Sequence, residues 1–201
     1  MTTPESIVPT IRTARLVMRP WVPEDLAPFA ALCADPVVME HFQGLMTFDQ
    51  CEEFIRRVDA CWSDRGWGLW AIEVPGVAPF IGYVGLWPAD HVCDRPAEVG
   101  WRLAKEHWGN GYAPEAAAEA LRLWFDEIGA PEIYSFTVTQ NHNSRRVMDK
   151  IGLRHDPGGD FDHPLVDPAL HPDLVRHVLY RLTADEWRAA VSGEPPHFPS
   201  M

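Results

Sequence analysis

Hydrophobic and polar positions at the start of the chain predict one strand and two helices. The run ARLVMRPW (14–21) alternates with the period of a strand. The segment PEDLAPFAALCAD (23–35), with acids in its first turn, is typical of a helix. Thr47 and Gln50 have capping-box spacing and are followed by apolar positions at helical spacing. A second helix is therefore expected within TFDQCEEFIRRVDACWSD (47–64).

The pattern changes to short apolar runs between residues 68 and 104. GLWAIEV, FIGYVGLW and AEVGWRLA predict three successive strands, at 68–74, 80–87 and 97–104. The connections between them are too short for a crossover helix, so we expect an antiparallel meander.

The rest of the chain alternates helices with strands. Spacing and end signals predict, in order, a helix over 114–128, a strand over 132–139, a helix over 143–151, a strand over 176–183 and a helix from Thr183. This order predicts an α+β fold in which helices flank a mainly antiparallel sheet. We expect one domain over 1–190 and a flexible tail over 191–201.

Composition and charge exclude several classes of protein. The formal net charge of −12 argues against nucleic acid as a partner, which would need a basic face, and mildly favours cationic substrates. No apolar run reaches the ~18 residues of a membrane span, so no membrane partner is expected. The four cysteines form no C-x-x-C pair and the N-terminus lacks a signal-peptide pattern, which together indicate a cytoplasmic protein with reduced thiols.

A glycine-rich turn before the helix at 114–128 is the first candidate for chemistry. Gly109 and Gly111 allow the backbone to adopt positive φ and to approach a ligand closely. Pro114 is expected at the first helical position, and Ala113, the expected N-cap, has no side-chain oxygen for the free N–H groups. A phosphate-bearing ligand would satisfy those groups. A plain strand-to-helix turn is the alternative.

Two common phosphate-binding motifs do not fit this turn. A P-loop needs a lysine after its second glycine, and the segment has none. A Rossmann fingerprint would need its third glycine where Pro114 stands, within a βαβ unit.

Two segments together resemble the GNAT acetyltransferases. WGNGYAPEA (108–116) is similar to the coenzyme A pyrophosphate loop of that family, and NHNSRRVMDKIGL (141–153) is similar to its N-x-x-S…K-x-G-[FL] segment. The resemblance extends from the strand near Ala14 to the one ending near Thr183. It implies the GNAT fold, a mixed, mainly antiparallel central sheet of about six to seven strands flanked by helices, with a splayed cleft for coenzyme A.

Within that family the chain is most similar to the RimJ/RimL-like enzymes, which acetylate protein N-terminal amines. That branch often has an aromatic residue, here Trp108, where other members have Gln or Arg. AEVGWRL (97–103) and FDHPLVDPALHPDLVRHVLYRL (161–182) also resemble the branch. The resemblance implies acetyl-CoA as cosubstrate, no metal, and an N-terminal α-amine of a protein or peptide as acceptor. A small amine (amino acid, polyamine or antibiotic) and a non-catalytic acyl-CoA-binding domain are the alternatives, and a homodimer is left open.

The resemblance also implies the coenzyme contacts. Loop amides hold the pyrophosphate in this family, and the corresponding residues here are Trp108, Gly109, Asn110, Gly111, Tyr112 and Ala113. The pantetheine arm would lie along the preceding strand, against the backbone of Trp101, Arg102 and Leu103. Asn141 and Ser144 match the positions beside the thioester.

Glu98 and Ser144 are the candidates for proton transfer. Glu98, at the start of the pantetheine strand, is expected to be the general base and so to contact the acceptor amine, directly or through water. Its alternative is an exposed carboxylate at a strand end. Many family members use a tyrosine as general acid, but Met148 stands at that position. We expect Ser144 to replace it, the alternative being an ordinary serine at a helix N-terminus.

The acceptor is expected to contact residues of two further segments. His41 and Phe42 lie between the first two predicted helices, where the acceptor groove of this family opens. Trp87 ends the strand before Glu98. Packing in the core is the alternative role for Phe42 and Trp87.

Three histidines near the C-terminus invite a metal assignment. The spacing of His163, His171 and His177 matches no zinc pattern, and no cysteine pair accompanies them. We expect them to shape the loop before the last strand and a wall of the acceptor pocket.

Overall fold

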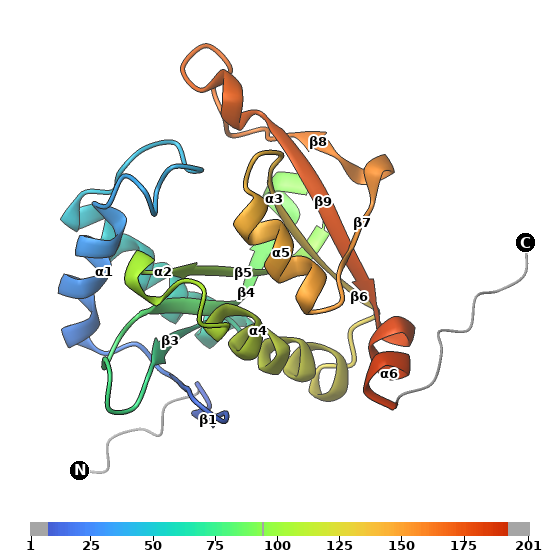
Figure 1. Cartoon of the computed structure of the whole chain (residues 1–201), viewed down its shortest axis with the longest axis horizontal. Helices are drawn as coiled ribbons and strands as arrows, with labels where there is room; N and C mark the ends of the chain where they lie inside the picture. Colours follow the sequence, from blue (N-terminus) through green and yellow to red (C-terminus); the bar gives the residue numbers. More distant parts are fainter. Residues whose placement is uncertain (1–7, 94, 193–201) are drawn as a thin grey trace, which may run out of the picture. The chain divides into compact units, whose positions relative to one another are not determined.

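The computed structural model of the chain describes residues 8–93 and 95–192. The chain divides into two compact units, one of residues 1–87 and 100–119 and the other of residues 88–99 and 120–201. Three elements run from one unit into the other along the chain: the strands β4 (Gly82–Ala89) and β5 (Arg95–Leu103) and the helix α4 (Tyr112–Arg122) (Figure 1).

The first unit is built on an antiparallel meander. Its strands are β1 (Ile11–Arg12), β2 (Val17–Arg19), β3 (Leu69–Glu73) and β4 (Gly82–Ala89), paired in that order. Met18 lies opposite Ile72, and Trp70 lies opposite Val84. The predicted meander is confirmed for β3 and β4.

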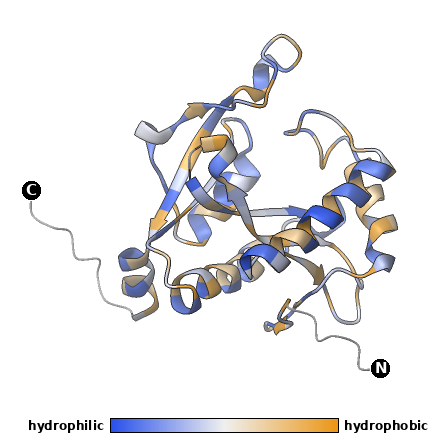
Figure 2. Cartoon of the chain, turned by 180° about the vertical axis from the view of Figure 1, so that it is seen from behind, coloured by the Kyte–Doolittle hydropathy of each residue, from blue (hydrophilic) through white to orange (hydrophobic). Residues whose placement is uncertain are grey.

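Two helices of this unit begin where the sequence predicts. A 3-10 turn at Pro23–Asp25 leads into α1 (Leu26–Cys33), and α2 spans Phe48–Arg65. The capping box is formed, because the Gln50 amide donates to Thr47 Oγ1 at 3.2 Å and the Thr47 amide donates to Gln50 Oε1 at 2.8 Å. Figure 2 shows α1 as mostly hydrophobic and α2 as mixed, and each helix buries only part of its surface, which includes Phe29, Leu32 and Cys33 of α1.

Aromatic rings form much of the core of this unit. Phe54 of α2 lies 5.3 Å from Tyr83 and stacks on Trp87 at 5.6 Å, both on β4. The same cluster includes Trp21, Phe29 and Phe80. Such rings bury large apolar areas and hold α1 and α2 against the meander.

The second half of β5 lies against the start of β4 in the same unit. The Ala104 amide donates to the Ile81 carbonyl at 2.8 Å. Gly82 has φ of 129° and packs so closely on the Arg102 carbonyl that a side chain at position 82 would collide with it. The glycine therefore permits this close approach of two backbones.

The second unit is organised by a long antiparallel pair. β6 (Glu132–Val138) pairs with β9 (Arg176–Thr183) along its whole length, from Glu132 opposite Thr183 to Val138 opposite His177. The first half of β5 lies parallel to β6, with Glu98 opposite Tyr134. β7 (Arg154–His155) and β8 (Phe161–Asp162) also pair with β9.

Helices α3 (Asp90–Cys93), α5 (His142–Lys150) and α6 (Ala184–Ser192) complete the second unit. The Thr183–Glu186 capping box of α6 forms as predicted, with the Glu186 amide donating to Thr183 Oγ1 at 3.3 Å. α6 reaches Ser192, two residues beyond the expected domain end at 190. The rest of the expected tail, 193–201, lies outside the described residues.

The fold class is confirmed as α+β with a mixed, mainly antiparallel arrangement of strands, but the described residues contain nine strands rather than six to seven. β1, β7 and β8 have two residues each, too few to show a period of two in the sequence.

Candidate active site

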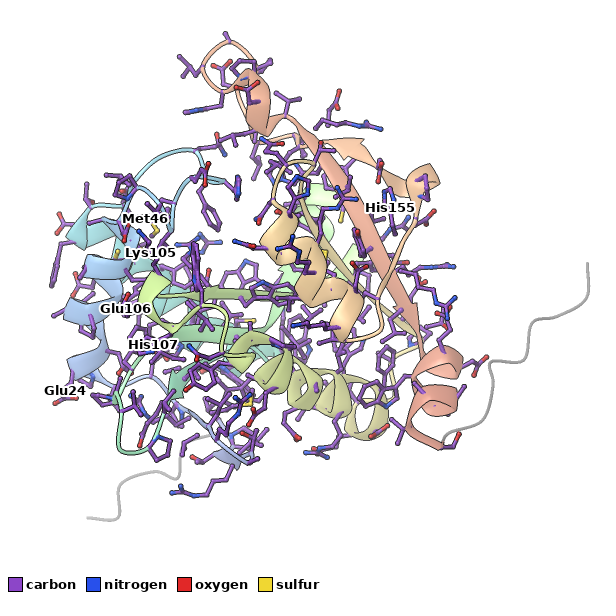
Figure 3. The ribbon with its side chains drawn as sticks, in the orientation of Figure 1. Glu24, Met46, Lys105, Glu106, His107 and His155 are labelled. Carbon is purple, nitrogen blue, oxygen red and sulfur yellow. The ribbon has the colours of Figure 1, made fainter. Side chains whose placement is uncertain are left out.

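The glycine turn has the backbone conformation that its sequence predicts. Gly109 and Gly111 have φ of 77° and 80°, in the left-handed region that other residues rarely adopt. The turn follows a 3-10 segment at Lys105–His107, whose three residues are labelled in Figure 3. The Asn110 side chain closes the turn by donating to the carbonyls of His107 and Trp108, both at 3.2 Å.

The helix after the turn begins earlier than expected. α4 starts at Tyr112, and the Gly111 carbonyl accepts from the Glu115 amide at 3.3 Å. Gly111 rather than Ala113 therefore precedes the helix, and Pro114 is its third residue. Because all of the first four amides lack intrahelical partners, proline is tolerated there as well. The sequence did not mark this start clearly, because Pro114 is a typical first helical residue and glycine, though accepted as an N-cap, is also common in turns.

The turn exposes a set of unsatisfied donors. The amides of Gly109, Asn110 and Gly111 donate to no acceptor within the described ranges. The first-turn amides of Tyr112 and Ala113 add to them at the positive end of the helix dipole. Successive N–H groups of this kind can bind a phosphate group.

Hydrogen bonds from Thr13 and Arg15, which the sequence did not predict, hold the start of α4 and the turn before it. Arg15 Nε donates to Glu115 Oε2 at 2.7 Å, and Arg15 Nη1 donates to the Asn110 carbonyl at 2.8 Å. Thr13 Oγ1 donates to Glu115 Oε1 at 2.6 Å. Burial raises the pKa of Glu115, but the hydrogen bonds from Thr13 and Arg15 outweigh it and hold the pKa below its ordinary value. The carboxylate is thus neutralised by the guanidinium and does not oppose an anion at the turn.

We expect Gly111→Val to weaken acetyl-CoA binding at least about tenfold, or about 1.4 kcal/mol. A side chain at this φ is strained, its Cβ would lie 3.3 Å from Arg15 Nη2, and the backbone would be displaced from the ligand. Calorimetric titration with acetyl-CoA measures the effect. Gly129→Val is the control, because Gly129 has φ of 74° and a Cβ there would meet no atom within 4 Å. Wild-type affinity in a folded Gly111→Val protein would refute the assignment.

The backbone groups of the three residues predicted to contact pantetheine differ in direction and in their hydrogen bonds. The Arg102 carbonyl faces Gly82 of β4. Backbone groups of neighbouring strand residues alternate in direction, so those of Trp101 and Leu103 point to the other edge. The Leu103 carbonyl already accepts from Trp108 Nε1 at 2.7 Å. Arg102 is thus a poor backbone contact, and Trp101 and Leu103 are better ones.

Asn141 and Ser144 form the N-terminus of α5. Asn141 Oδ1 accepts from the Ser144 amide at 3.1 Å, and Asn141 Nδ2 donates to Thr137 Oγ1 at 2.9 Å. The asparagine side chain is therefore the helix cap, while the serine hydroxyl makes no hydrogen bond to any described residue. Met148 is fully buried, so its position belongs to the core here.

Glu98 occupies an environment that disfavours its ionised form. It is half-buried on β5, between the buried residues Ala97 and Val99 and opposite Tyr134 of β6. The protein packed around the carboxyl removes much of its hydration, and this desolvation raises the pKa of Glu98 to about 8. A carboxylate with such a pKa is a stronger base than one in water.

The three residues predicted to contact the acceptor each make different contacts. Phe42 is 39% exposed, and its ring lies 4.0 Å from the Arg102 guanidinium. Trp87 is half-buried, packed on Phe54 with Arg57 over its ring at 5.5 Å. His41 Nε2 lies 3.9 Å from Glu40 Oε2.

Two of the C-terminal histidines pack against aromatic rings. His163 and His177 lie 4.8 Å apart among Phe136 and Phe161, and desolvation lowers the pKa of His177. Residues 8–93 and 95–192 contain no group of three or more metal-ligating side chains. Nor does this part of the chain contain a helix both long and apolar enough to cross a membrane.

The chain matches the family described as an acetyltransferase (GNAT) domain over residues 15–154. It therefore belongs to the GNAT acetyltransferases, enzymes that acetylate an amine with acetyl-CoA as cosubstrate. The donor-rich glycine turn fits the anionic part of that cosubstrate.

Relatives and solved structures agree with this membership. The FsC-acetyl coenzyme A-N(2)-transacetylase of Aspergillus fumigatus is 31% identical over 196 residues, covering 89% of this chain and 78% of the relative. An acetyltransferase from Agrobacterium tumefaciens superimposes with a TM-score of 0.71 at 27% identity, covering 87% and 94% of the two chains. A spermidine N-acetyltransferase from Vibrio cholerae, solved with CoA and spermine, shares the fold with a TM-score of 0.67 at 18% identity, covering 88% and 99%.

Proposed function

We propose that this enzyme acetylates the α-amine at the N-terminus of a peptide or protein, in the cytoplasm. The observation that carries the proposal is the place of Glu98, half-buried on β5 between Ala97 and Val99, where desolvation raises its pKa to about 8. An α-amine also has a pKa of about 8. Proton transfer between groups of matched pKa is efficient near neutral pH.

The acceptor amine must be neutral before it can react. Holding an α-amine neutral at pH 7 costs about 1.4 kcal/mol, whereas a lysine side chain costs about 4.6 kcal/mol. A single carboxylate base is therefore adequate for an α-amine. The similarity of Trp108 and of AEVGWRL (97–103) to the RimJ/RimL-like branch favours the same acceptor.

Each residue has a defined part in the proposed reaction. The amides from Gly109 to Ala113 hold the pyrophosphate, and Trp101 and Leu103 offer backbone groups to the pantetheine arm. Acetyl-CoA supplies the acetyl group as a thioester. Glu98 takes a proton from the amine as its nitrogen bonds to the acetyl carbon, and Ser144 donates a proton to the sulfur as the carbon–sulfur bond breaks.

A pair of peptides tests the acceptor. We expect a short peptide with a free N-terminus to be acetylated at least about 100-fold faster than the same peptide with its N-terminus blocked, because blocking removes the reacting nitrogen. Both peptides should contain one lysine, so that acetylation of the side chain would be detected. Thiol release from acetyl-CoA measures the rate. Equal rates on the two peptides would exclude the N-terminal acceptor.

A small amine is the second candidate acceptor. The observation favouring it is the Aspergillus fumigatus relative, which is named for acetyl transfer to N(2) of FsC. The same assay with amino acids, polyamines and aminoglycosides distinguishes the two. Faster turnover of a small amine than of every free-N-terminus peptide would favour this second candidate.

A further inference from the structure

Arg102 carries a buried positive charge that the described residues leave without an anionic partner. Its side chain is 9% exposed, and no carboxylate within the described ranges forms an ion pair with it. Nη1 donates to Cys33 Sγ and to Met46 Sδ, both at 3.3 Å, and Nε is buried without any acceptor. Met46 is labelled in Figure 3, on the segment between α1 and α2.

Sulfur atoms are poor substitutes for an anion. A guanidinium presents five N–H donors in a rigid fork that matches a carboxylate, whereas thiol and thioether sulfurs accept hydrogen bonds weakly. Burial raises the pKa of the neighbouring Cys51 thiol to about 12, so that thiol is neutral as well. A charge buried in this way is destabilising unless something else compensates it.

Arg19 shows how the same unit treats a structural arginine. Its Nη1 and Nη2 donate to the two oxygens of Asp25 at 2.7 and 2.8 Å, and its Nε lies 3.4 Å from Glu73 Oε2. The hydrogen bond and charge of Asp25 raise the pKa of Arg19 despite burial. The fold therefore pairs one part-buried arginine with carboxylates and leaves the other without any.

Aromatic rings surround the unpaired guanidinium. Phe42 lies over it at 4.0 Å and Tyr83 lies at 5.5 Å, and both interactions stabilise a cation without neutralising it. Phe42 is itself 39% exposed, so one of the rings against Arg102 also faces solvent. A fork of donors beneath an exposed ring suits a carboxylate attached to an organic molecule.

We propose that Arg102 binds a carboxylate of the acceptor, so that the preferred acceptor is an amine that also carries a carboxylate. This inference rests on the proposed acetylation of an amine at Glu98. The carboxylate has two sources, an Asp or Glu near the start of a peptide or the carboxyl group of a small amino acid. Both sources present a carboxylate that the guanidinium can bind.

The net charge of the protein does not by itself explain a preference for acceptors that carry a carboxylate. With a formal net charge of −12, the long-range field repels an anionic acceptor and attracts a polyamine. A preference for acidic acceptors would thus have to come from a local cation, and Arg102 is a buried one. A preference for polyamines would follow from the net charge alone.

Matched acid and amide acceptors test the proposal. Peptides of one length with amidated C-termini carry Asp or Asn at position 1, 2 or 3, and a second series compares amino acids with their amides. We expect kcat/KM to be about 10- to 100-fold higher for the acid at the best position, as for a hydrogen bond to a charged group. Arg102→Met should remove this preference, so that the ratio of kcat/KM on the acid to kcat/KM on the amide falls to about one.

Two controls separate binding from folding. Arg102→Lys keeps the charge but loses the fork, so it should retain part of the preference. Arg19→Met removes the paired arginine and should lower the melting temperature without changing the acid-to-amide ratio. Equal rates of the wild type on acid and amide in both series would overturn the proposal, and this result needs no variant. A preference that persists in folded Arg102→Met would also overturn it.

The outcomes also separate this inference from the proposed peptide acceptor. Acetylation of amino acids over their amides, with no acetylation of any peptide, would support the role of Arg102 and refute the N-terminal acceptor. Acetylation of peptides with no preference for the acid would support the N-terminal acceptor and refute the role of Arg102. Faster turnover of polyamines than of all carboxylate-bearing amines would overturn the inference.

Discussion

Glu98→Gln is expected to lower kcat/KM at pH 7 by about 10²–10⁴. The substitution keeps the shape of the side chain but removes the base. Raising the pH should restore much of the activity, because the α-amine, of pKa about 8, is then already neutral and hydroxide or water can take the proton released during attack. The measurement is a pH–rate profile of both proteins with a free-N-terminus peptide.

The raised pKa of Glu98 makes the shape of the profile diagnostic. In the wild type both the carboxyl group, with its pKa of about 8, and the amine must lose a proton, so the acidic limb rises with a slope approaching two. In Glu98→Gln only the amine titrates, and the slope should fall to one. A lysine acceptor would displace the limb upward by about two pH units. Superimposable profiles would remove Glu98 from the mechanism.

The stability of Glu98→Gln relative to the wild type serves as a control, and the raised pKa of Glu98 fixes the direction in which it changes with pH. In the unfolded chain Glu98 ionises near its ordinary pKa of about 4.3, whereas in the folded chain its pKa is about 8. Between these values the unfolded state has lost a proton that the folded state keeps, so Glu98 makes stability fall as pH rises through this range. We expect Glu98→Gln to melt higher than the wild type at pH 8 and close to it at pH 4. Its loss of activity would then not reflect unfolding.

Ser144→Ala is expected to lower turnover by about 10- to 1000-fold with acetyl-CoA affinity little changed. A thiol has a pKa of about 8.5, so the leaving thiolate needs only a weak proton donor, which limits the effect. The hydroxyl makes no hydrogen bond to any described residue, and the cap uses the backbone amide of Ser144. Alanine therefore preserves the cap and favours the helix.

Single-turnover kinetics, in which chemistry limits the rate, are the measurement for Ser144→Ala. Asn141→Ala removes the cap at a cost of about 1 kcal/mol but leaves the hydroxyl in place, and its acetyl-CoA affinity is measured as well because Asn141 is itself a predicted coenzyme contact. Turnover unaltered by Ser144→Ala would mean that water or another group supplies the proton.

Signals within a few residues of one another allowed much of the fold to be predicted. The capping boxes at Thr47 and Thr183 marked two helix starts, and the run at 176–183 became β9 with those bounds. One helix was misjudged at both of its ends. α4 begins at Tyr112 rather than Pro114, and its expected last turns form a π-helix at Leu123–Glu127. Ends of helices depend on packing as well as on local sequence.

The candidate site, like the fold, could be predicted only in part from the sequence. The motifs pointed to the glycine turn, and the left-handed conformation of Gly109 and Gly111 is confirmed. The resemblance also singled out Glu98, but its pKa could not be read from the sequence, because it depends on the protein packed around β5. The roles of Glu98 and Ser144 stay predictions for the experiments above.

Neighbouring residues along the chain were enough to predict the order and type of the main elements, the family and the turn that fits the coenzyme. The elements and the turn depend on periodicity, caps and glycine spacing, all of which are local, and the family was indicated by the resemblance of two short motifs. Folding was needed to show that Arg15 clamps Glu115, one hundred residues away, and that Arg102 is buried beneath Phe42 without a carboxylate. Contacts between distant residues arise when packed elements bring them together, and no local pattern records whether a buried charge has found a partner.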